Sequence, residues 1–142
     1  MSEDTLRQVR IDRISAGSYT ATNPRGGTIR IGSGEEDDFS PVELLLAAIG
    51  SCTTTDADVA TTRHVEPDAF TVTVSGNKIH DEQGNRMTDL AVTFHVVFPE
   101  GAEGDAARAI LPRAVKLSHE RLCTVSRTVE IGTPVTSTIA DV

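Results

Sequence analysis

The segment SPVELLLAAIGSC, residues 40–52, carries a complete start signal for an α-helix. Ser40 is a favourable N-cap residue, Pro41 suits the first helical position, and Glu43 stands where a capping box needs its acid. In such a box the serine and glutamate side chains each accept a hydrogen bond from the other residue's backbone N–H. We therefore expect a helix to begin at Pro41.

The leucines and alanines that follow favour helix, and the next proline is Pro67, so we expect a long helix over residues 41–64. Its apolar part is too short to span a bilayer, which predicts a buried helix at the centre of the fold. At about 100° per residue, Cys52 shares a helical face with Ala48 and Ile49. The thiol of Cys52 is therefore expected to point at the core or at a pocket within it.

The chain has 142 residues and a formal net charge of −8. This length favours one domain with a substantial core, and the charge argues against nucleic-acid binding, which needs clustered Lys and Arg. The N-terminus lacks the apolar segment of a signal peptide, so we expect a cytoplasmic protein without a membrane association. Two cysteines in a reducing compartment are either a redox pair or two inert buried thiols, and composition does not choose between them.

Three short segments before the helix predict a small antiparallel meander over residues 5–32. The predicted strands are 5–14, 19–22 and 28–32, and their expected inward residues are Val9, Ile11, Ile29 and Ile31. So small a sheet cannot bury much by itself, so it must pack on the helix or on another copy of the chain.

After the helix, residues 69–142 are predicted to form a β-hairpin, helices and a closing strand. Apolar residues alternate with polar ones from Phe70 to Ser75 and again over residues 90–98, with a loop over residues 81–85 between them. Helical sequence follows from Asp105, and Pro112 should kink or split it, leaving a second helix over residues 112–121. Val135, Ile139 and several threonines favour the closing strand. The expected class is α+β, with antiparallel sheets packed around the long central helix.

The cysteines are the main candidates for chemistry, because a thiolate is a strong nucleophile. Cys52 lies about three turns into its helix, beyond the useful reach of the N-terminal dipole. Asp56, one turn later on the same face, opposes thiolate formation, so activation needs a positive partner from elsewhere. The alternative interpretation is that both cysteines are small buried hydrophobic residues. No cofactor or metal is expected. The four histidines, His64, His80, His95 and His119, show no ligand spacing, and no glycine-rich phosphate loop follows a strand.

Two segments resemble one known family. PVELLLAAIGSC, with Pro41 eleven residues before Cys52, is similar to the signature of the osmotically induced and organic-hydroperoxide-resistance proteins, the OsmC/Ohr family. LCTVSRTV, which contains Cys123, resembles the second-cysteine segment of that family. The resemblance covers nearly the whole chain and implies a single OsmC-like domain over residues 1–142. It also implies an intertwined homodimer, in which the N-terminal meander packs across the other subunit.

The resemblance further implies a thiol peroxidase that reduces small organic hydroperoxides. Cys52 would match the peroxidatic cysteine, which attacks the O–O bond and becomes a sulfenic acid. Cys123 would match the resolving cysteine, which condenses with it to an intramolecular disulfide. An external dithiol, in one branch of the family a lipoylated protein, would then reduce that disulfide.

One position departs from the better-studied branches. They carry a glutamate directly after the signature proline, where it pairs with the arginine that activates the thiolate, and here that position is Val42. Glu43 is rotated by about 100° around the helix and does not replace it. Three arginines could supply the activating charge, and the motifs select none of them: Arg13, Arg25 and Arg30. The chain thus resembles a less characterised OsmC-like branch, and its alternative function is a non-catalytic dimeric protein that binds an apolar ligand or senses oxidants.

Overall fold

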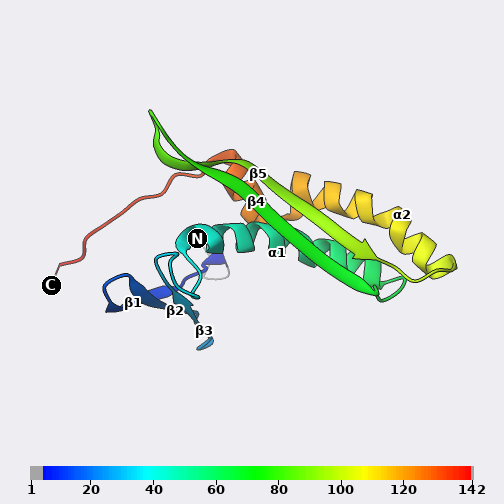
Figure 1. Cartoon of the computed structure of the whole chain (residues 1–142), viewed down its shortest axis with the longest axis horizontal. Helices are drawn as coiled ribbons and strands as arrows, with labels where there is room; N and C mark the ends of the chain where they lie inside the picture. The colour runs from blue at the N-terminus through cyan, green and yellow to red at the C-terminus, as the bar shows by residue number, and fades with distance from the viewer. Residues whose placement is uncertain (1–4, 142) are drawn as a thin grey trace. The chain divides into compact units, whose positions relative to one another are not determined.

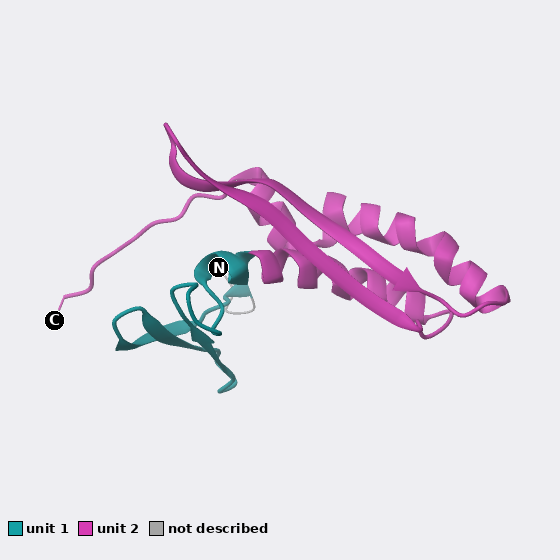
Figure 2. Ribbon diagram, in the orientation of Figure 1, with its two compact units in different colours: residues 1–45 teal, residues 46–142 magenta. Residues whose placement is uncertain are grey.

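The computed structural model describes residues 5–141 and has the expected α+β class, with two antiparallel sheets (Figure 1). The chain forms two compact units, residues 1–45 and 46–142, and the boundary falls within the first turns of the long helix (Figure 2). The elements in chain order are β1 (Arg10–Ser15), β2 (Ser18–Thr22), β3 (Thr28–Ile31), α1 (Pro41–Thr62), β4 (Ala69–Asp81), β5 (Gly84–Val97), α2 (Ala102–Leu117), the π-helix η2 (Ser118–Leu122) and α3 (Thr124–Ile131).

The first unit contains the predicted meander, a three-stranded antiparallel sheet in the order β1-β2-β3. The side chain of Asn23 holds the turn between β2 and β3, because its Oδ1 accepts hydrogen bonds from the backbone N–H groups of Arg25 and Gly27. Of the four residues expected to point inward, only Ile31 is buried. The other three are more than half exposed within this chain, so their burial against another surface stays a prediction: Val9, Ile11 and Ile29.

Helix α1 begins with the predicted capping box. The backbone N–H of Ser40 donates to Glu43 Oε1 at 2.8 Å, and the backbone N–H of Glu43 donates to Ser40 Oγ at 3.2 Å. The second half of α1 is rich in threonine, a residue with low helix propensity. There the hydroxyl groups of Thr54 and Thr61 donate to the carbonyl groups one turn earlier, at 2.7 and 3.0 Å. These internal bonds satisfy the hydroxyl groups without interrupting the helix.

The second unit is built on the long hairpin β4–β5, which packs against α1. A two-residue turn joins the strands, and a bulge follows Ser75. Alternate residues of β4 are half-buried or exposed, as the period of two predicted. Gly50 brings α1 close to β4, because a Cβ at this position would overlap the side chain of Val74. The hairpin thus forms one wall beside the middle of α1, where Cys52 lies.

The predicted split at Pro112 is wrong, because α2 continues through it from Ala102 to Leu117. A proline inside a helix removes one backbone hydrogen bond. Packing of the preceding turns compensates: Ala107 is fully buried, and Gly104 lies so close to Pro99 that a Cβ would overlap its carbonyl oxygen. The helix also starts earlier than the predicted Asp105, whose N–H donates to the carbonyl of Gly101.

The predicted closing strand is also absent from the described residues. Residues 133–141 form neither helix nor strand, and the side chains of Val135 and Ile139 are 90% and 97% exposed. A strand needs the backbone of a neighbour for its hydrogen bonds, and this segment pairs with no strand of its own chain among residues 5–141. The preceding segment instead forms helix α3, which ends at Gly132 in the left-handed conformation.

Candidate functional site

The two cysteines meet in the second unit. Cys52 projects from α1, and Cys123 lies between η2 and α3, about 70 residues later. Their side chains lie close enough for each to shift the pKa of the other, and both are free thiols. Cys52 is half-buried, whereas Cys123 is 0% exposed. The expectation that these two cysteines approach closely is confirmed.

Cys123 is the C-cap of η2, at the end of the preceding helix as its position in the sequence indicated, and it is also the N-cap of α3. Its Sγ accepts a hydrogen bond from the backbone N–H of Ser126 at 3.4 Å. The Ser126 hydroxyl lies 3.3 Å from the same sulfur and can accept from the thiol or donate to the thiolate. The preceding backbone N–H, that of Val125, hydrogen-bonds to Cys52. The first turn of α3 therefore provides one amide donor to each of the two sulfurs.

The two thiols differ in acidity. Burial raises the pKa of Cys52, and the hydrogen bond with Cys123 and the negative charges of Cys123 and Asp56 raise it further, against a lowering by the N–H of Val125. Burial also raises the pKa of Cys123, but hydrogen bonds from Cys52, Ser126 and Thr53 outweigh it and lower that pKa below its ordinary value. Cys123 is therefore the first sulfur of the pair to lose its proton, with Cys52 as a donor to it.

Asp56 has a hydroxyl partner where a cation was expected. Its Oδ2 accepts a hydrogen bond of 2.6 Å from the hydroxyl of Ser118, a fully buried residue at the start of η2. This bond ties α1 to η2, and the backbone N–H of Cys123 donates to the carbonyl of the same Ser118 at 2.8 Å. Asp56 and Ser118 thus hold the π-helical turn that presents Cys123 to Cys52. Short π-helices often occur at functional sites.

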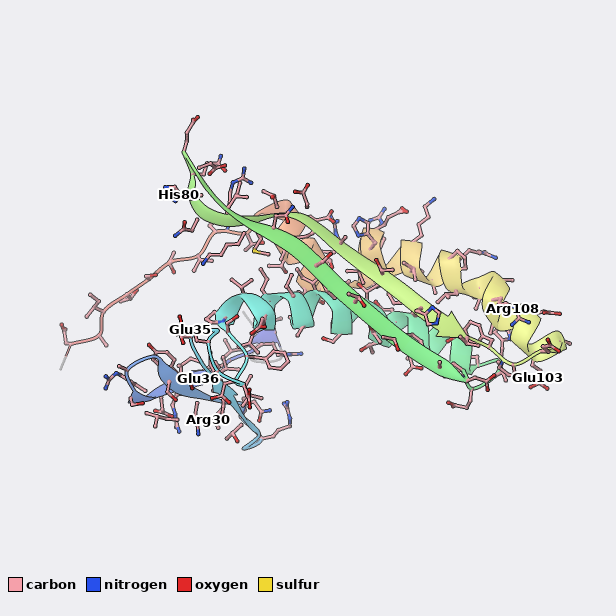
Figure 3. The ribbon with its side chains drawn as sticks, viewed as in Figure 1. Arg30, Glu35, Glu36, His80, Glu103 and Arg108 are labelled. Carbon is pink, nitrogen blue, oxygen red and sulfur yellow. The ribbon has the colours of Figure 1, made fainter. Side chains whose placement is uncertain are left out.

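Among the groups of the described chain that shift the pKa of Cys52 most, one is the acid Asp56, and none is an arginine or a lysine. The three arginines considered from the sequence belong to the N-terminal unit. Arg30, labelled in Figure 3, donates to Ser18 and forms a 3.8 Å ion pair with Asp38 in that unit. No arginine is therefore assigned to the site.

An apolar cavity of about 240 Å³ lies between β5 and the helices, and its lining includes neighbours of the two cysteines but neither cysteine itself. Thr53 and Ser126, which both contact Cys123, also line this cavity. His119 and Glu130 form its polar edge, with Nε2 and Oε1 3.2 Å apart. The rest of the lining is apolar: Ile49, Leu90, Val92, Phe94, Val115 and Val129. An apolar molecule in this cavity would thus lie next to the hydroxyl groups that surround Cys123.

The other polar residues singled out in the sequence lie away from this arrangement or have structural partners. Figure 3 shows His80 at the turn of the hairpin, where its Nδ1 and the Oδ1 of Asn85 are 2.9 Å apart. Glu43 is engaged in the capping box. Among residues 5–141, no group of three or more His, Cys, Asp or Glu side chains could hold a metal ion. No helix in that part of the chain is long and apolar enough to cross a membrane.

Sequence reasoning identified both cysteines but missed Thr53, Ser118 and Ser126. Ser126 had a readable signal, because a residue three positions after an N-cap presents its N–H to the cap side chain. Thr53 and Ser118 had none, since their roles depend on contacts between segments far apart in the chain. The signal for Ser126 was hidden because Cys123 was assigned to the end of one helix and not to the start of another.

The fold and the paired thiols define a small α+β protein with a dithiol centre near an apolar cavity. A sequence model described as OsmC-like protein matches residues 34–138, so the chain belongs to the OsmC-like family. An uncharacterised protein of Mycobacterium tuberculosis is 27% identical over 139 residues, covering 96% of this chain and 98% of the relative.

Solved structures show the same fold. A hypothetical protein from Aquifex aeolicus is 23% identical with a TM-score of 0.71, covering 90% of this chain and 89% of that one. An OsmC-like protein of unknown function from Vibrio cholerae is 18% identical with a TM-score of 0.70, covering 92% of this chain and 95% of that one. At these identities the likeness concerns the fold.

Proposed function

We propose that this protein is a cysteine-based thiol peroxidase that reduces small organic hydroperoxides to alcohols. The observation that supports this function best is the pair of neighbouring free thiols, Cys52 and Cys123, near an apolar cavity. The cavity suits the hydrocarbon part of a hydroperoxide, because burial of apolar surface favours binding. Its polar wall, formed by Thr53 and Ser126, suits the peroxide oxygens.

Cys52 is the sulfur that attacks the peroxide. It is half-buried, whereas Cys123 is enclosed, so a peroxide reaches Cys52 first. The Cys123 thiolate is the base next to Cys52 and takes the proton of the Cys52 thiol during the attack. This transfer runs uphill, because the pKa of Cys123 is lowered and that of Cys52 is raised. The Cys52 thiolate then attacks the terminal peroxide oxygen, the O–O bond breaks, and the leaving alkoxide takes a proton to become the alcohol.

The second step forms a disulfide. Cys52 is now a sulfenic acid, and the Cys123 thiolate attacks its sulfur while the hydroxyl group leaves as water with one proton. The two thiols together supply the two electrons and two protons that convert one hydroperoxide into one alcohol and one water. An external dithiol, such as a lipoylated protein, then reduces the disulfide. Because both cysteines must be reduced between turnovers, this function requires a reducing compartment, and we place the protein in the cytoplasm.

The active form in this proposal is a homodimer. Val9, Ile11 and Ile29 of the meander are more than half exposed, which is costly for so many apolar side chains on a small sheet. A second copy of the chain would cover them, with roughly 2,000 Å² or more buried in total. Sedimentation as a monomer at micromolar concentration would contradict this assembly.

Thiol titration during reaction with cumene hydroperoxide tests the enzymatic function. One equivalent of peroxide should remove both free thiols and release one equivalent of the alcohol. The Cys52→Ser variant should consume no peroxide, and the Cys123→Ser variant should stop at a sulfenic acid that dimedone traps on Cys52. If both thiols persist after prolonged exposure, the peroxidase proposal fails.

One observation favours a second function: the pKa of Cys52 is raised, and no arginine or lysine is among the groups that shift it most. A thiol that keeps its proton reacts slowly with peroxides. On this alternative the protein binds an apolar ligand in the cavity or senses oxidants, without turnover. Binding of a fluorescent apolar probe that protects against unfolding, together with unreactive thiols in the titration above, would select it.

A further inference from the structure

The two sulfurs of the site have unequal surroundings, and this bears on how a Cys52–Cys123 disulfide is reduced. A reducing thiolate attacks one sulfur of a disulfide and expels the other as a thiolate. Which sulfur is attacked depends on access, and which one leaves depends on how well its surroundings hold a negative charge. Both properties differ between Cys52 and Cys123.

Access favours attack at Cys52, which is half-buried, over Cys123, which is 0% exposed. Cys123 is closed in by Ser126, whose Oγ lies 3.3 Å from its sulfur, and by Thr53. Both neighbours are themselves buried, with exposed fractions of 8% and 5%. A reductant therefore reaches the Cys52 side of the disulfide without displacing these side chains.

Charge stabilisation favours Cys123 as the leaving sulfur. The backbone N–H of Ser126 donates to its sulfur at 3.4 Å, and the hydroxyl of Ser126, 3.3 Å away, accepts from the thiol and can turn to donate to the thiolate. It also stands at the N-terminus of α3, where the helix dipole stabilises a negative charge. Cys52 has one amide donor, from Val125, and the carboxylate of Asp56 disfavours its thiolate.

We infer that a reductant attacks the disulfide at Cys52, that Cys123 is the leaving sulfur, and that Ser126 is a catalytic residue which stabilises the departing thiolate. This inference rests on the proposed dithiol chemistry and specifies its reductive half. The reductant thiolate forms a bond to Cys52 Sγ, the Cys52–Cys123 bond breaks, and its electron pair moves to Cys123 Sγ. The second thiol of the reductant then attacks the first reductant sulfur and expels Cys52, which takes up the released proton. The reductant leaves as a cyclic disulfide, and both protein thiols are restored.

The partner class that follows is a dithiol whose reactive sulfur is exposed and unhindered. It needs to reach only the half-buried side of the pair, so a thiol on a flexible arm fits better than a cysteine recessed in a protein surface. The enclosed Cys123 is in turn protected from forming mixed disulfides with cellular monothiols.

The test maps the mixed disulfide formed by a monothiol. The full-length protein is oxidised with diamide, which needs no hydroperoxide, then treated briefly with 2-mercaptoethanol and quenched with N-ethylmaleimide. Trypsin separates the two sites, because Cys52 falls in the peptide 31–63 and Cys123 in the peptide 122–127. We expect mercaptoethanol on the first peptide and maleimide on the second. Mercaptoethanol mainly on peptide 122–127 overturns the inference, and so does failure of diamide to remove both thiols.

Variants of α3 test the role of Ser126. In Ser126→Ala the backbone donor remains and the hydroxyl is lost, so reduction by mercaptoethanol should slow by about tenfold, the usual effect of a hydrogen bond to a charged group. The alkylation profile of Cys123 should also move to higher pH. Thr128→Ala is the matched control, because that hydroxyl bonds to the carbonyl of Thr124 on the exposed side of α3. Equal rates in both variants overturn the assignment of Ser126.

This test and the test of the proposed function fail separately. If the protein leaves hydroperoxides intact but carries mercaptoethanol on Cys52, the peroxidase proposal fails and the reductive assignment stands. If it consumes hydroperoxides but carries the adduct on Cys123, only the reductive assignment fails.

Discussion

Replacement of Asp56 should weaken the fold while making Cys52 more acidic. Asp56 Oδ2 accepts a 2.6 Å hydrogen bond from Ser118, whose side chain is fully buried. In Asp56→Ala this hydroxyl loses its partner, and an unpaired buried polar group costs about 1–3 kcal/mol. For a chain of this length the melting temperature should fall by roughly 3–10 °C.

The same variant should shift the reactivity of Cys52 in the opposite sense. The charge of Asp56 is one of the causes that raise the pKa of Cys52, so its removal lowers that pKa. Alkylation of Cys52 in a Cys123→Ser background should therefore begin at lower pH when Asp56 is absent. The protein thus becomes less stable and more reactive at the same time.

Two measurements check this reasoning. Urea unfolding gives the change in stability, with Asp58→Ala as the matched control, because Asp58 is an exposed acid on the same helix. A double-mutant cycle of Asp56→Ala with Ser118→Ala isolates the bond between them. A coupling free energy near zero, or equal losses of stability in the Asp56 and Asp58 variants, would show that the bond between Asp56 and Ser118 does not stabilise η2.

Three further outcomes are expected. Gly50→Ala should destabilise the protein by about 1–2 kcal/mol in urea unfolding, because the cost of overlap with Val74 exceeds the gain in helix propensity. A more stable variant would show that β4 shifts to accommodate the added methyl group. Asp81→Asn should lower stability at neutral pH but not at a pH below the folded pKa of Asp81. Arg86 lowers that pKa, so the contribution is present above the unfolded value and is lost as pH falls through the folded one. An equal difference at both pH values would contradict that linkage. Val129→Phe should fill the cavity and slow reduction of cumene hydroperoxide by about tenfold, as expected for roughly 55 Å² less apolar burial, while sparing hydrogen peroxide. An equal decrease in the rates of reduction of both peroxides would show that cumene hydroperoxide does not bind in this cavity.

Local interactions made several elements predictable. The capping box at Ser40 and Glu43 joins residues three apart, so the start of α1 could be read directly from the chain. The alternation in β4 and β5 reflects the geometry of a strand with one covered face, and it was equally readable. The resemblance added the pairing of Cys52 with Cys123, which no spacing in the sequence indicates.

Elements that depend on distant neighbours were misassigned. Pro112 stays inside α2 because the turns before it pack closely, and that packing is not visible in the local sequence. The β-branched residues near the C-terminus favoured a strand, yet a strand forms only where another backbone pairs with it, and residues 133–141 find none within the described chain.

The sequence by itself determined the helix that carries Cys52, the hairpin beside it, and the presence of a second cysteine in a familiar motif. Only the tertiary structure decided which thiol is the more acidic. That order depends on the contact between α1, which carries Cys52, Thr53 and Asp56, and the start of α3, which carries Cys123 and Ser126. Hydrogen bonds and charges act through space, so the acidity of each thiol also depends on the groups of the other segment that folding places beside it, and the sequence does not show this contact.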